Sequence, residues 1–319
     1  MNTVPHPGAV TLDLPFRAPY DWPRVLRFLA GRAIPGVETV EANAWRRAIE
    51  WAGASGMLTV RRHPRRPCLG MTVEGPASVH AAALVGPVSR LFDLHAEPAA
   101  IAAHLGSDPW LAPLVEAAPG LRVPGAWSGF ELVVRAIVGQ QISVKAATTI
   151  VGRLVGRAGR PVEGFPAGTA SLFPTPAALA GADLAAIGMP GRRVAALQGF
   201  AQAVATGALP IDGIDPANDS GVTTDETRRD LTDLRAKLLA LPGIGPWTVE
   251  YVAMRAWRDP DAWPASDLVL VQAIAARDPM LGRAAGQRVR TDAWRPWRAY
   301  AAMHLWNEIA DRAGAARGG

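Results

Sequence analysis

Apolar and polar residues follow short alternating patterns in the first third of the chain. Residues 10–14 alternate, which is typical of a half-buried strand. Three further strand-like runs, bounded by Gly or Pro, cover residues 37–50, 56–62 and 68–73. Helices are predicted over residues 21–30, 77–94 and 98–105. Strands followed by helices within roughly 110 residues indicate an α+β domain.

From Pro124 onward, apolar residues recur every three to four positions, which is the spacing of helices with one buried face. This spacing predicts helices over residues 127–138, 143–157, 175–187, 192–206, 231–241, 248–257, 267–276 and 297–313. Short breaks containing Gly and Pro separate several of them, and no repeat has a fixed period. We therefore predict an α+β domain with an antiparallel sheet over residues 1–120, followed by an all-α bundle over residues 121–319.

One stretch, residues 210–230, has no apolar period. It holds six acidic and two basic residues among Gly, Pro, Ser, Thr and Asn, so we predict a solvated or disordered loop. The chain has 33 Lys+Arg and 28 Asp+Glu, for a net charge of +5. Without this stretch the counts are 31 and 22, so the remainder carries +9. A basic body fits a phosphate-bearing partner and, equally, an ordinary solvated surface.

Composition narrows the class of protein further. The chain has 319 residues, of which 49% are apolar, enough to fill the cores of two domains. A single cysteine, Cys68, excludes a disulfide framework, a four-cysteine zinc site and a protein-ligated iron–sulfur cluster. No apolar run approaches the roughly 20 residues that span a bilayer, and the first ten residues lack a signal-peptide pattern. We expect a cytoplasmic protein without a membrane partner.

The most informative short stretch is Leu-Pro-Gly-Ile-Gly-Pro-Trp-Thr at residues 241–248. Gly243 and Gly245 allow the chain to reverse between two helices, and Ile244 would fill the angle between them. Pro246 suits the first position of the second helix, whose N-terminal N–H groups would then face outward as a phosphate site. The alternative is a helix–turn–helix corner that binds nothing.

These residues resemble the helix-hairpin-helix DNA glycosylases, in which Leu-Pro-Gly-Ile-Gly is followed by a catalytic Asp. Asp267 lies 20 residues after Trp247, at the predicted start of a helix. Within that superfamily the chain is most similar to the bacterial DNA-3-methyladenine glycosylase II (AlkA) type. Four other segments carry this likeness, at residues 19–22, 89–94, 134–140 and 294–300. The resemblance spans about residues 10–306, with residues 210–230 as the main insertion.

The resemblance implies that Asp267 is the catalytic carboxylate. Breaking an N-glycosidic bond builds positive charge on the sugar, which a fixed carboxylate stabilises while it orients or activates water. The alternative role of Asp267 is the N-cap of the following helix, and both roles can hold together. The target base must leave the duplex, and an alkylated purine is cationic, so aromatic faces would attract it.

By resemblance the pocket walls are Trp247, Tyr251 and Trp306, with Phe28 as a fourth candidate. The alternative for all four is ordinary core packing. We expect the other tryptophans near the C-terminus to be mainly core: Trp257, Trp263, Trp294 and Trp297. His304 is expected to be structural.

DNA contacts are expected from the hairpin and from one wedge. The hairpin candidates are Gly243, Ile244, Gly245 and Thr248. The wedge candidate is Gln141, where the best-known relative has Leu, and the alternative is a plain helix–helix connection. We expect no cofactor and no metal bound by side chains. The family's hairpin often holds a monovalent cation on backbone carbonyls, here near Leu241 and Ile244.

The resemblance also bears on the type of reaction. Relatives that also cut the strand carry a Lys at position 247 as Schiff-base nucleophile, whereas this chain has Trp247. We therefore expect a monofunctional, nucleoid-associated and monomeric glycosylase acting on double-stranded DNA with alkylated bases. Two alternatives stay open: a non-catalytic helix-hairpin-helix DNA-binding protein, and a glycosylase for oxidised or mismatched bases.

Overall fold

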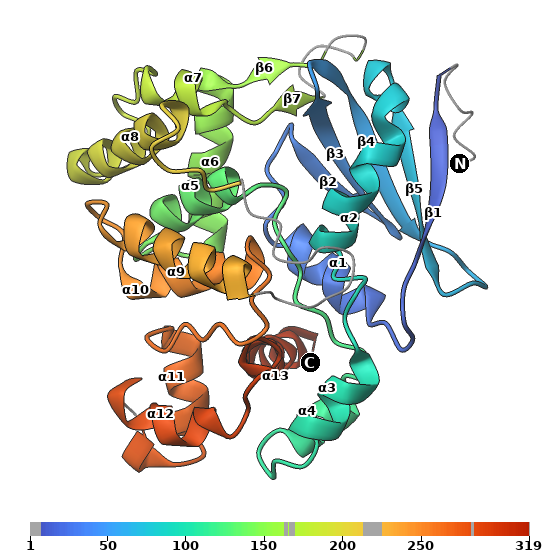
Figure 1. Cartoon of the computed structure of the whole chain (residues 1–319), viewed down its shortest axis with the longest axis vertical. Coiled ribbons are helices and arrows are strands. Elements are labelled where there is room, and N and C mark those ends of the chain that lie inside the picture. The colour runs from blue at the N-terminus through green and yellow to red at the C-terminus, as the bar shows by residue number, and fades with distance from the viewer. Residues whose placement is uncertain (1–7, 163–164, 166–169, 213–224, 282–283, 319) are drawn as a thin grey trace.

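The computed structural model of the chain describes residues 8–162, 165, 170–212, 225–281 and 284–318 (Figure 1). Its N-terminal part contains a five-stranded antiparallel sheet in the order β1-β5-β4-β3-β2. The strands are β1 (Val10–Pro15), β2 (Glu38–Glu41), β3 (Ala44–Trp51), β4 (Ala54–Arg62) and β5 (Cys68–Glu74). The predicted antiparallel sheet with helices is therefore confirmed.

Alternation along the strands gives the sheet two different faces. On one face Trp45, Leu58 and Met71 are buried beneath α1 (Trp22–Ala30), η1 (Pro76–Leu84) and α2 (Val85–Leu91). On the other face a smaller apolar cluster forms around Ala48 and Met57. The first face holds the N-terminal core, which fixes the position of α1 next to the helical part.

Two elements of this part differ from the sequence prediction. The predicted strand over residues 37–50 is two strands, β2 and β3, because the chain turns back at Ala42, which has a φ of +49°. The predicted helix over residues 77–94 begins as the 3₁₀ turns of η1 and becomes α-helical only from Val85.

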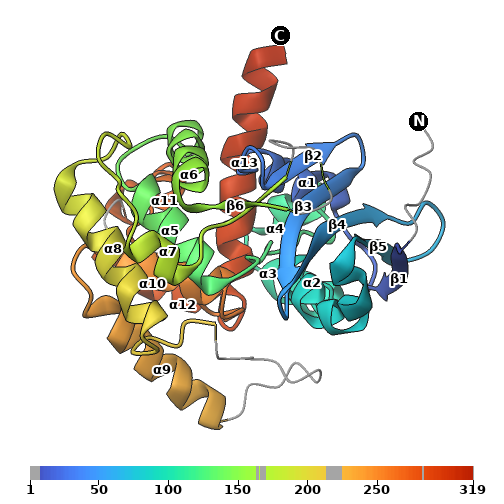
Figure 2. The same cartoon turned by 90° about the horizontal axis from the view of Figure 1, so that it is seen from above.

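The rest of the chain is mainly helical, as predicted. Its elements are α3 (Pro98–Leu105), α4 (Ala112–Ala117), α5 (Gly129–Gly139), α6 (Val144–Ala158), α7 (Pro176–Ala180), α8 (Gly191–Ala205), α9 (Asp225–Leu239), α10 (Pro246–Arg255), α11 (Leu268–Ala275), η2 (Pro279–Leu281), α12 (Ala284–Asp292) and α13 (Arg298–Gly318). They enclose a second core that includes Leu154, Phe200, Trp257 and Trp294. Seen from above, α13 lies between helices α5–α10 on one side and the sheet with α1 and α2 on the other (Figure 2).

The helical part departs from the prediction in three places. A two-stranded hairpin, β6 (Arg160–Pro161) and β7 (Ser171–Leu172), lies beside β3 and covers part of the sheet. The helix predicted over residues 175–187 stops at Ala180, where Gly181 follows. Helices α4 and α12 were not predicted, because α4 is very short and α12 is polar without an apolar period.

The predicted loop over residues 210–230 is ordered at both ends. Asp212 accepts hydrogen bonds from the backbone N–H groups of Gly129 and Phe130, so it caps the start of α5. Residues 225–230 form the beginning of α9. Residues 213–224 lie outside the described part of the chain. Among the described residues, no helix has the length and apolar character needed to cross a membrane.

A buried ion network joins the sheet to the helical part. Arg47 of β3 pairs with Glu38 at 2.6 Å and with Glu131 of α5, and Arg135 pairs with Glu38 at 3.1 Å. Burial by itself would raise the pKa of Glu131, but Arg47 and Arg135 outweigh burial and lower it. Because each buried charge has a partner, the network fixes α5 against the sheet.

Candidate active site

The Gly-Ile-Gly hairpin joins α9 to α10 and has one position that requires glycine. Gly243 has a φ of +81°, and a Cβ there would approach the Ala196 Cβ to 2.9 Å. Gly245 is extended, and a Cβ there would meet open space. The prediction that both glycines are needed for the turn therefore holds for Gly243 alone. Ile244 is buried between the helices, as predicted.

Helix α10 begins at Pro246, which has no N–H, and it has no side-chain cap. The N–H groups of Trp247 and Thr248 in its first turn therefore have neither a helical nor a side-chain acceptor among the residues that the structure describes. The Thr248 hydroxyl does not lie at the surface, because that side chain is only 2% exposed. A DNA contact by this residue therefore falls to its backbone N–H. In the hairpin, the Leu241 carbonyl accepts the Ile244 N–H at 3.2 Å.

The wedge candidate lies in the connection between α5 and α6. Gln141 is exposed and has a φ of +61°, so the chain bends sharply there. The neighbouring Gln140 donates from Nε2 to the Gly243 carbonyl at 2.8 Å. The connection is thereby tied to the hairpin, which keeps the two segments in a fixed relation.

One cleft of about 600 Å³ brings the predicted catalytic and pocket residues together. Its walls come from α1, α5, α6, α10 and α13, with the start of α11 at one side. Five predicted residues line it: Phe28, Trp247, Tyr251, Asp267 and Trp306. We call it the Asp267 cleft.

Four N–H groups hold the half-buried Asp267 carboxylate. Oδ1 accepts the backbone N–H groups of Val269 at 3.0 Å and Leu270 at 3.1 Å, so Asp267 is the N-cap of α11 as predicted. Oδ1 also accepts the Trp306 indole N–H at 3.0 Å, and Oδ2 accepts that of Trp247 at 2.9 Å. The two indole edges therefore orient the carboxylate toward the cleft that their rings line.

The aromatic rings do not form two parallel walls with a gap for a base between them. Trp247 and Tyr251 lie one helical turn apart and stack on each other, with centroids 5.0 Å apart and planes inclined by 10°. A base between two rings needs about 7 Å, or two contact distances, so none fits between this pair. Trp306 meets Tyr251 edge-on at 6.3 Å. The stacked pair thus forms one wall of the cleft rather than two.

Arg255 is a site residue that the sequence interpretation missed. It continues the four-residue spacing of Trp247 and Tyr251 along α10, and that spacing was the available signal. Its Nη1 donates to the Tyr251 hydroxyl at 2.7 Å. Its Nε and Nη2 donate to the carbonyls of Pro124 at 2.9 Å and Gly125 at 2.7 Å. A buried guanidinium is thereby fixed at the base of the cleft.

This arginine alters the chemistry of the tyrosine. Burial by itself would raise the pKa of the Tyr251 phenol, but the Arg255 and Arg32 guanidinium groups outweigh burial and lower it. The hydroxyl oxygen accepts the Arg255 N–H, so its own proton is available to a third group in the cleft.

Phe28 lines the cleft but is partly covered. The Arg32 guanidinium carbon lies 3.8 Å from the centre of its ring, and that of Arg255 lies 4.7 Å from it. A base that stacks on Phe28 would therefore meet guanidinium groups. Arg32 was also missed from the sequence, although it lies four residues after Phe28.

The other tryptophans near the C-terminus and His304 lie outside the group of residues that line the cleft. Trp257, Trp263 and Trp294 are buried in the core, as expected, whereas Trp297 is half-buried. His304 is buried, and burial lowers its pKa to about 4. In the part of the chain that the structure describes, no group of three or more His, Cys, Asp or Glu residues could hold a metal ion.

Two family matches cover most of the chain. Residues 11–128 match the AlkA N-terminal domain, and residues 134–299 match the HhH-GPD superfamily of base excision DNA repair proteins. The chain is 34% identical to DNA-3-methyladenine glycosylase 2 of Escherichia coli, over 92% of this chain and 95% of the relative. The predicted superfamily and type are therefore confirmed.

A second relative is longer than this chain. The probable bifunctional transcriptional activator/DNA repair enzyme AlkA of Mycobacterium tuberculosis is 37% identical over 95% of this chain. The match covers only 58% of that relative's length. Among solved structures, the 3-methyladenine DNA-glycosylase from Archaeoglobus fulgidus has the same fold, with a TM-score of 0.71 at 21% identity. That match covers 92% of this chain and 96% of the other.

Proposed function

The chain belongs to the HhH-GPD superfamily of base excision DNA repair proteins, and on this basis we propose that it excises alkylated bases from double-stranded DNA. It flips the damaged nucleotide into the Asp267 cleft and hydrolyses the N-glycosidic bond. The products are a free base and an abasic site. The substrates are alkylated bases such as 3-methyladenine and 7-methylguanine.

The position of the Asp267 carboxylate is the observation that carries this proposal. It lies in a 600 Å³ cleft with aromatic walls, and four N–H groups fix it there. As the base leaves, positive charge develops on the sugar, and a preorganised carboxylate stabilises that charge. The same carboxylate orients the attacking water.

Base recognition combines stacking with hydrogen bonding. The Trp247–Tyr251 pair offers one face to a cationic, electron-poor base, and Trp306 limits the cleft across from Tyr251. The Tyr251 proton, left free by the Arg255 hydrogen bond, is donated to an acceptor atom of the base. Phe28 completes the wall once Arg32 moves aside.

We also infer that water, and not an amine, is the nucleophile. Position 247 is Trp, and neither lysine of the chain lines the Asp267 cleft. Lys145 lies in the first turn of α6, and Lys237 pairs with Asp233 at 2.7 Å. The enzyme is therefore proposed to leave the strand uncut.

Binding to DNA is proposed to use the hairpin. The first-turn N–H groups of α10 and the backbone at Gly243 and Gly245 would contact phosphate, and Gln141 would enter the stack that the flipped base leaves. The Leu241 and Ile244 carbonyls suit a monovalent cation, because carbonyl oxygens are hard ligands. The protein is proposed to act as a monomer.

The test is base release by the purified wild-type protein. DNA treated with a methylating agent is incubated with the protein, and free bases are separated by chromatography, followed by duplexes with single defined lesions. Release of 3-methyladenine and 7-methylguanine, with strand cleavage only after added alkali, is expected. DNA binding without base release would favour a non-catalytic binding protein. Preferred release of oxidised or mismatched bases, or a borohydride-trapped covalent complex, would contradict the proposed substrates or nucleophile.

A further inference from the structure

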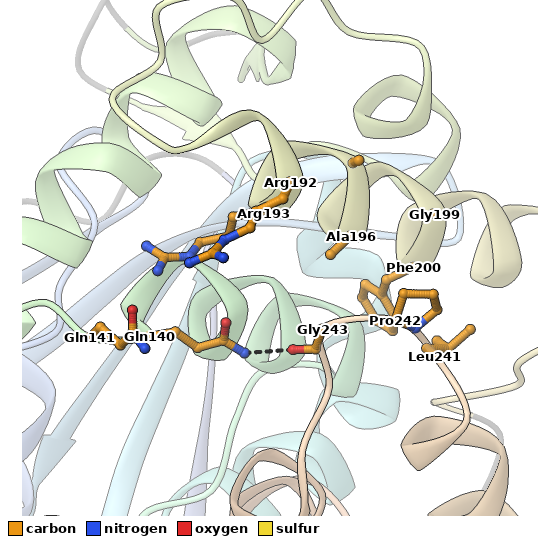
Figure 3. A pocket seen from close by; sticks show the side chains of 11 residues that line it. Gln140, Gln141, Arg192, Arg193, Ala196, Gly199, Phe200, Leu241, Pro242 and Gly243 are labelled. Atoms are coloured by element: carbon orange, nitrogen blue, oxygen red, sulfur yellow. Dashed lines mark hydrogen bonds between the residues drawn. The ribbon is translucent and has the colours of Figure 1, made fainter.

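A second cavity of about 620 Å³ lies beside the hairpin, on the other side of the α5–α6 connection from the Asp267 cleft. Helix α8 forms one wall, and Leu241, Pro242 and Gly243 form another (Figure 3). Phe200 provides an apolar floor, and Gln140 and Gln141 of the α5–α6 connection line a third side. We call this space the α8 cavity.

The connection between α5 and α6 separates the two spaces, because neighbouring residues along it line different cavities. Gly139 and Ile142 line the Asp267 cleft, whereas Gln140 and Gln141 between them line the α8 cavity. The bond from Gln140 to the Gly243 carbonyl keeps this partition attached to the hairpin. If the flipped base enters the cleft on one side of the connection, the complementary strand, which keeps its bases in the stack, lies on the other side.

Two arginines give the α8 cavity its charge. Arg192 and Arg193 lie in the first turn of α8 and extend toward Gln140 and Gln141 (Figure 3). Within the ranges that the structure describes, neither has a carboxylate at ion-pair distance. Cations at a helix N-terminus oppose the helix dipole, so their placement is unfavourable unless an anion binds between them. The cavity is therefore suited to phosphate.

We propose that the α8 cavity holds the backbone of the complementary DNA strand opposite the flipped base, with Arg192 and Arg193 pairing two of its phosphates. This inference rests on the proposed function, because it requires a duplex with one base removed from the stack. Gln141 lines the same cavity, where it would face the base that has lost its partner. The two cavities thus divide the strands: the lesion strand at the cleft, the complementary strand at α8.

The experiment compares the full-length wild type with the double variant Arg192→Ala/Arg193→Ala. The probe is a duplex with an uncleavable abasic analogue, and its dissociation constant is measured by fluorescence anisotropy at several salt concentrations. The variant is expected to bind roughly tenfold more weakly, with a salt slope lower by about 2, since two phosphate contacts are lost. Its deficit should disappear on a duplex whose complementary strand carries uncharged methylphosphonates opposite the analogue.

The control variant is Arg61→Ala/Arg65→Ala, which removes the same charge from the exposed end of β4 and the loop after it. It should keep wild-type affinity and salt slope. The proposal is overturned if the α8 variant binds like the wild type, if the control variant loses as much, or if the deficit is relieved instead by methylphosphonates in the lesion strand. Base release by the wild type, measured in parallel, shows separately whether the proposed function holds.

Discussion

Replacement of Arg255 by Met tests whether a single buried guanidinium assembles the Asp267 cleft. Methionine keeps an unbranched stem of similar length but donates no hydrogen bond. The change leaves three buried acceptors without their donor: the carbonyls of Pro124 and Gly125 and the Tyr251 hydroxyl. These acceptors lie on two separate segments, so their loss also loosens the contact between residues 124–125 and α10.

The expected size of the effect follows from these contacts. A buried acceptor that loses its donor costs about 1–3 kcal/mol, and three acceptors lose theirs. Burial lowers the pKa of Arg255, so relief of the guanidinium's desolvation offsets part of this loss. All three partners are neutral, so no buried charge is left unpaired, and we expect a net loss of about 2–4 kcal/mol for Arg255→Met. Tyr251→Phe removes only one acceptor and should cost about 1–3 kcal/mol. Because the two residues share a bond, the double variant should lose less than the sum.

The assay is equilibrium unfolding in urea, followed by tryptophan fluorescence and by circular dichroism so that two-state behaviour is checked. Arg255→Lys should lie between wild type and Arg255→Met, because one ammonium cannot reach all three acceptors. Arg65→Ala, on the exposed β4–β5 loop, should stay within about 0.5 kcal/mol. A loss below 1 kcal/mol for Arg255→Met at an unchanged m-value would refute the reasoning.

Three further predictions concern the helical core, the cleft and the ion network. Because burial lowers the pKa of His304 to about 4, the unfolded chain binds one more proton than the folded chain between pH 4 and pH 6.5. Stability therefore decreases as the pH is lowered through this range. Between pH 7.5 and pH 4.5 the protonation of His304 lowers the free energy of unfolding by about 2–3 kcal/mol. His304→Gln should remove this part of the pH dependence in paired urea titrations. Equal pH dependence of both proteins would contradict the prediction. Trp306→Phe keeps an aromatic ring but loses the N–H that donates to Asp267. The single-turnover rate of base excision should therefore fall less in Trp306→Phe than in Trp306→Ala. Equal rates of the two variants would exclude a stacking role for Trp306. Glu131→Gln should lower the free energy of unfolding by about 3–5 kcal/mol because Arg47 is left underpaired, and a change under 1 kcal/mol would argue against the network.

The fold was largely predictable because the periodic pattern of apolar residues reflects burial directly. The prediction was wrong where a tight turn or a polar surface determined the structure. The turn at Ala42 splits one apparent strand into two, although Ala carries no turn signal. Helix α12 has no apolar period but is tied to the rest of the chain by Arg290, which pairs with Asp108 at 2.6 Å. The β6–β7 hairpin forms because its strands pair and pack against the sheet.

The site was predictable as a set of residues but not as a geometry. The family resemblance indicated Asp267 and four aromatic residues, and all five line one cleft. Stacking of Trp247 on Tyr251, by contrast, depends on side-chain rotamers. The four-residue spacing places Arg255 on the same face of α10 as Trp247 and Tyr251, but its role depends on hydrogen bonds to carbonyls more than 100 positions away, which the spacing does not reveal.

The most direct measurement of the central claim uses Asp267→Asn. Asparagine has the same shape and is an equally good N-cap, so α11 should stay intact. The charge is lost, together with the hydrogen bond that Oδ2 accepts from the Trp247 indole. The account predicts that single-turnover release of 3-methyladenine from a defined duplex falls by at least about 10²-fold. Affinity for a duplex with an abasic analogue should stay within about threefold of wild type, since the hairpin is untouched. Near-wild-type base release by this variant would contradict the assignment of Asp267 as the catalytic group.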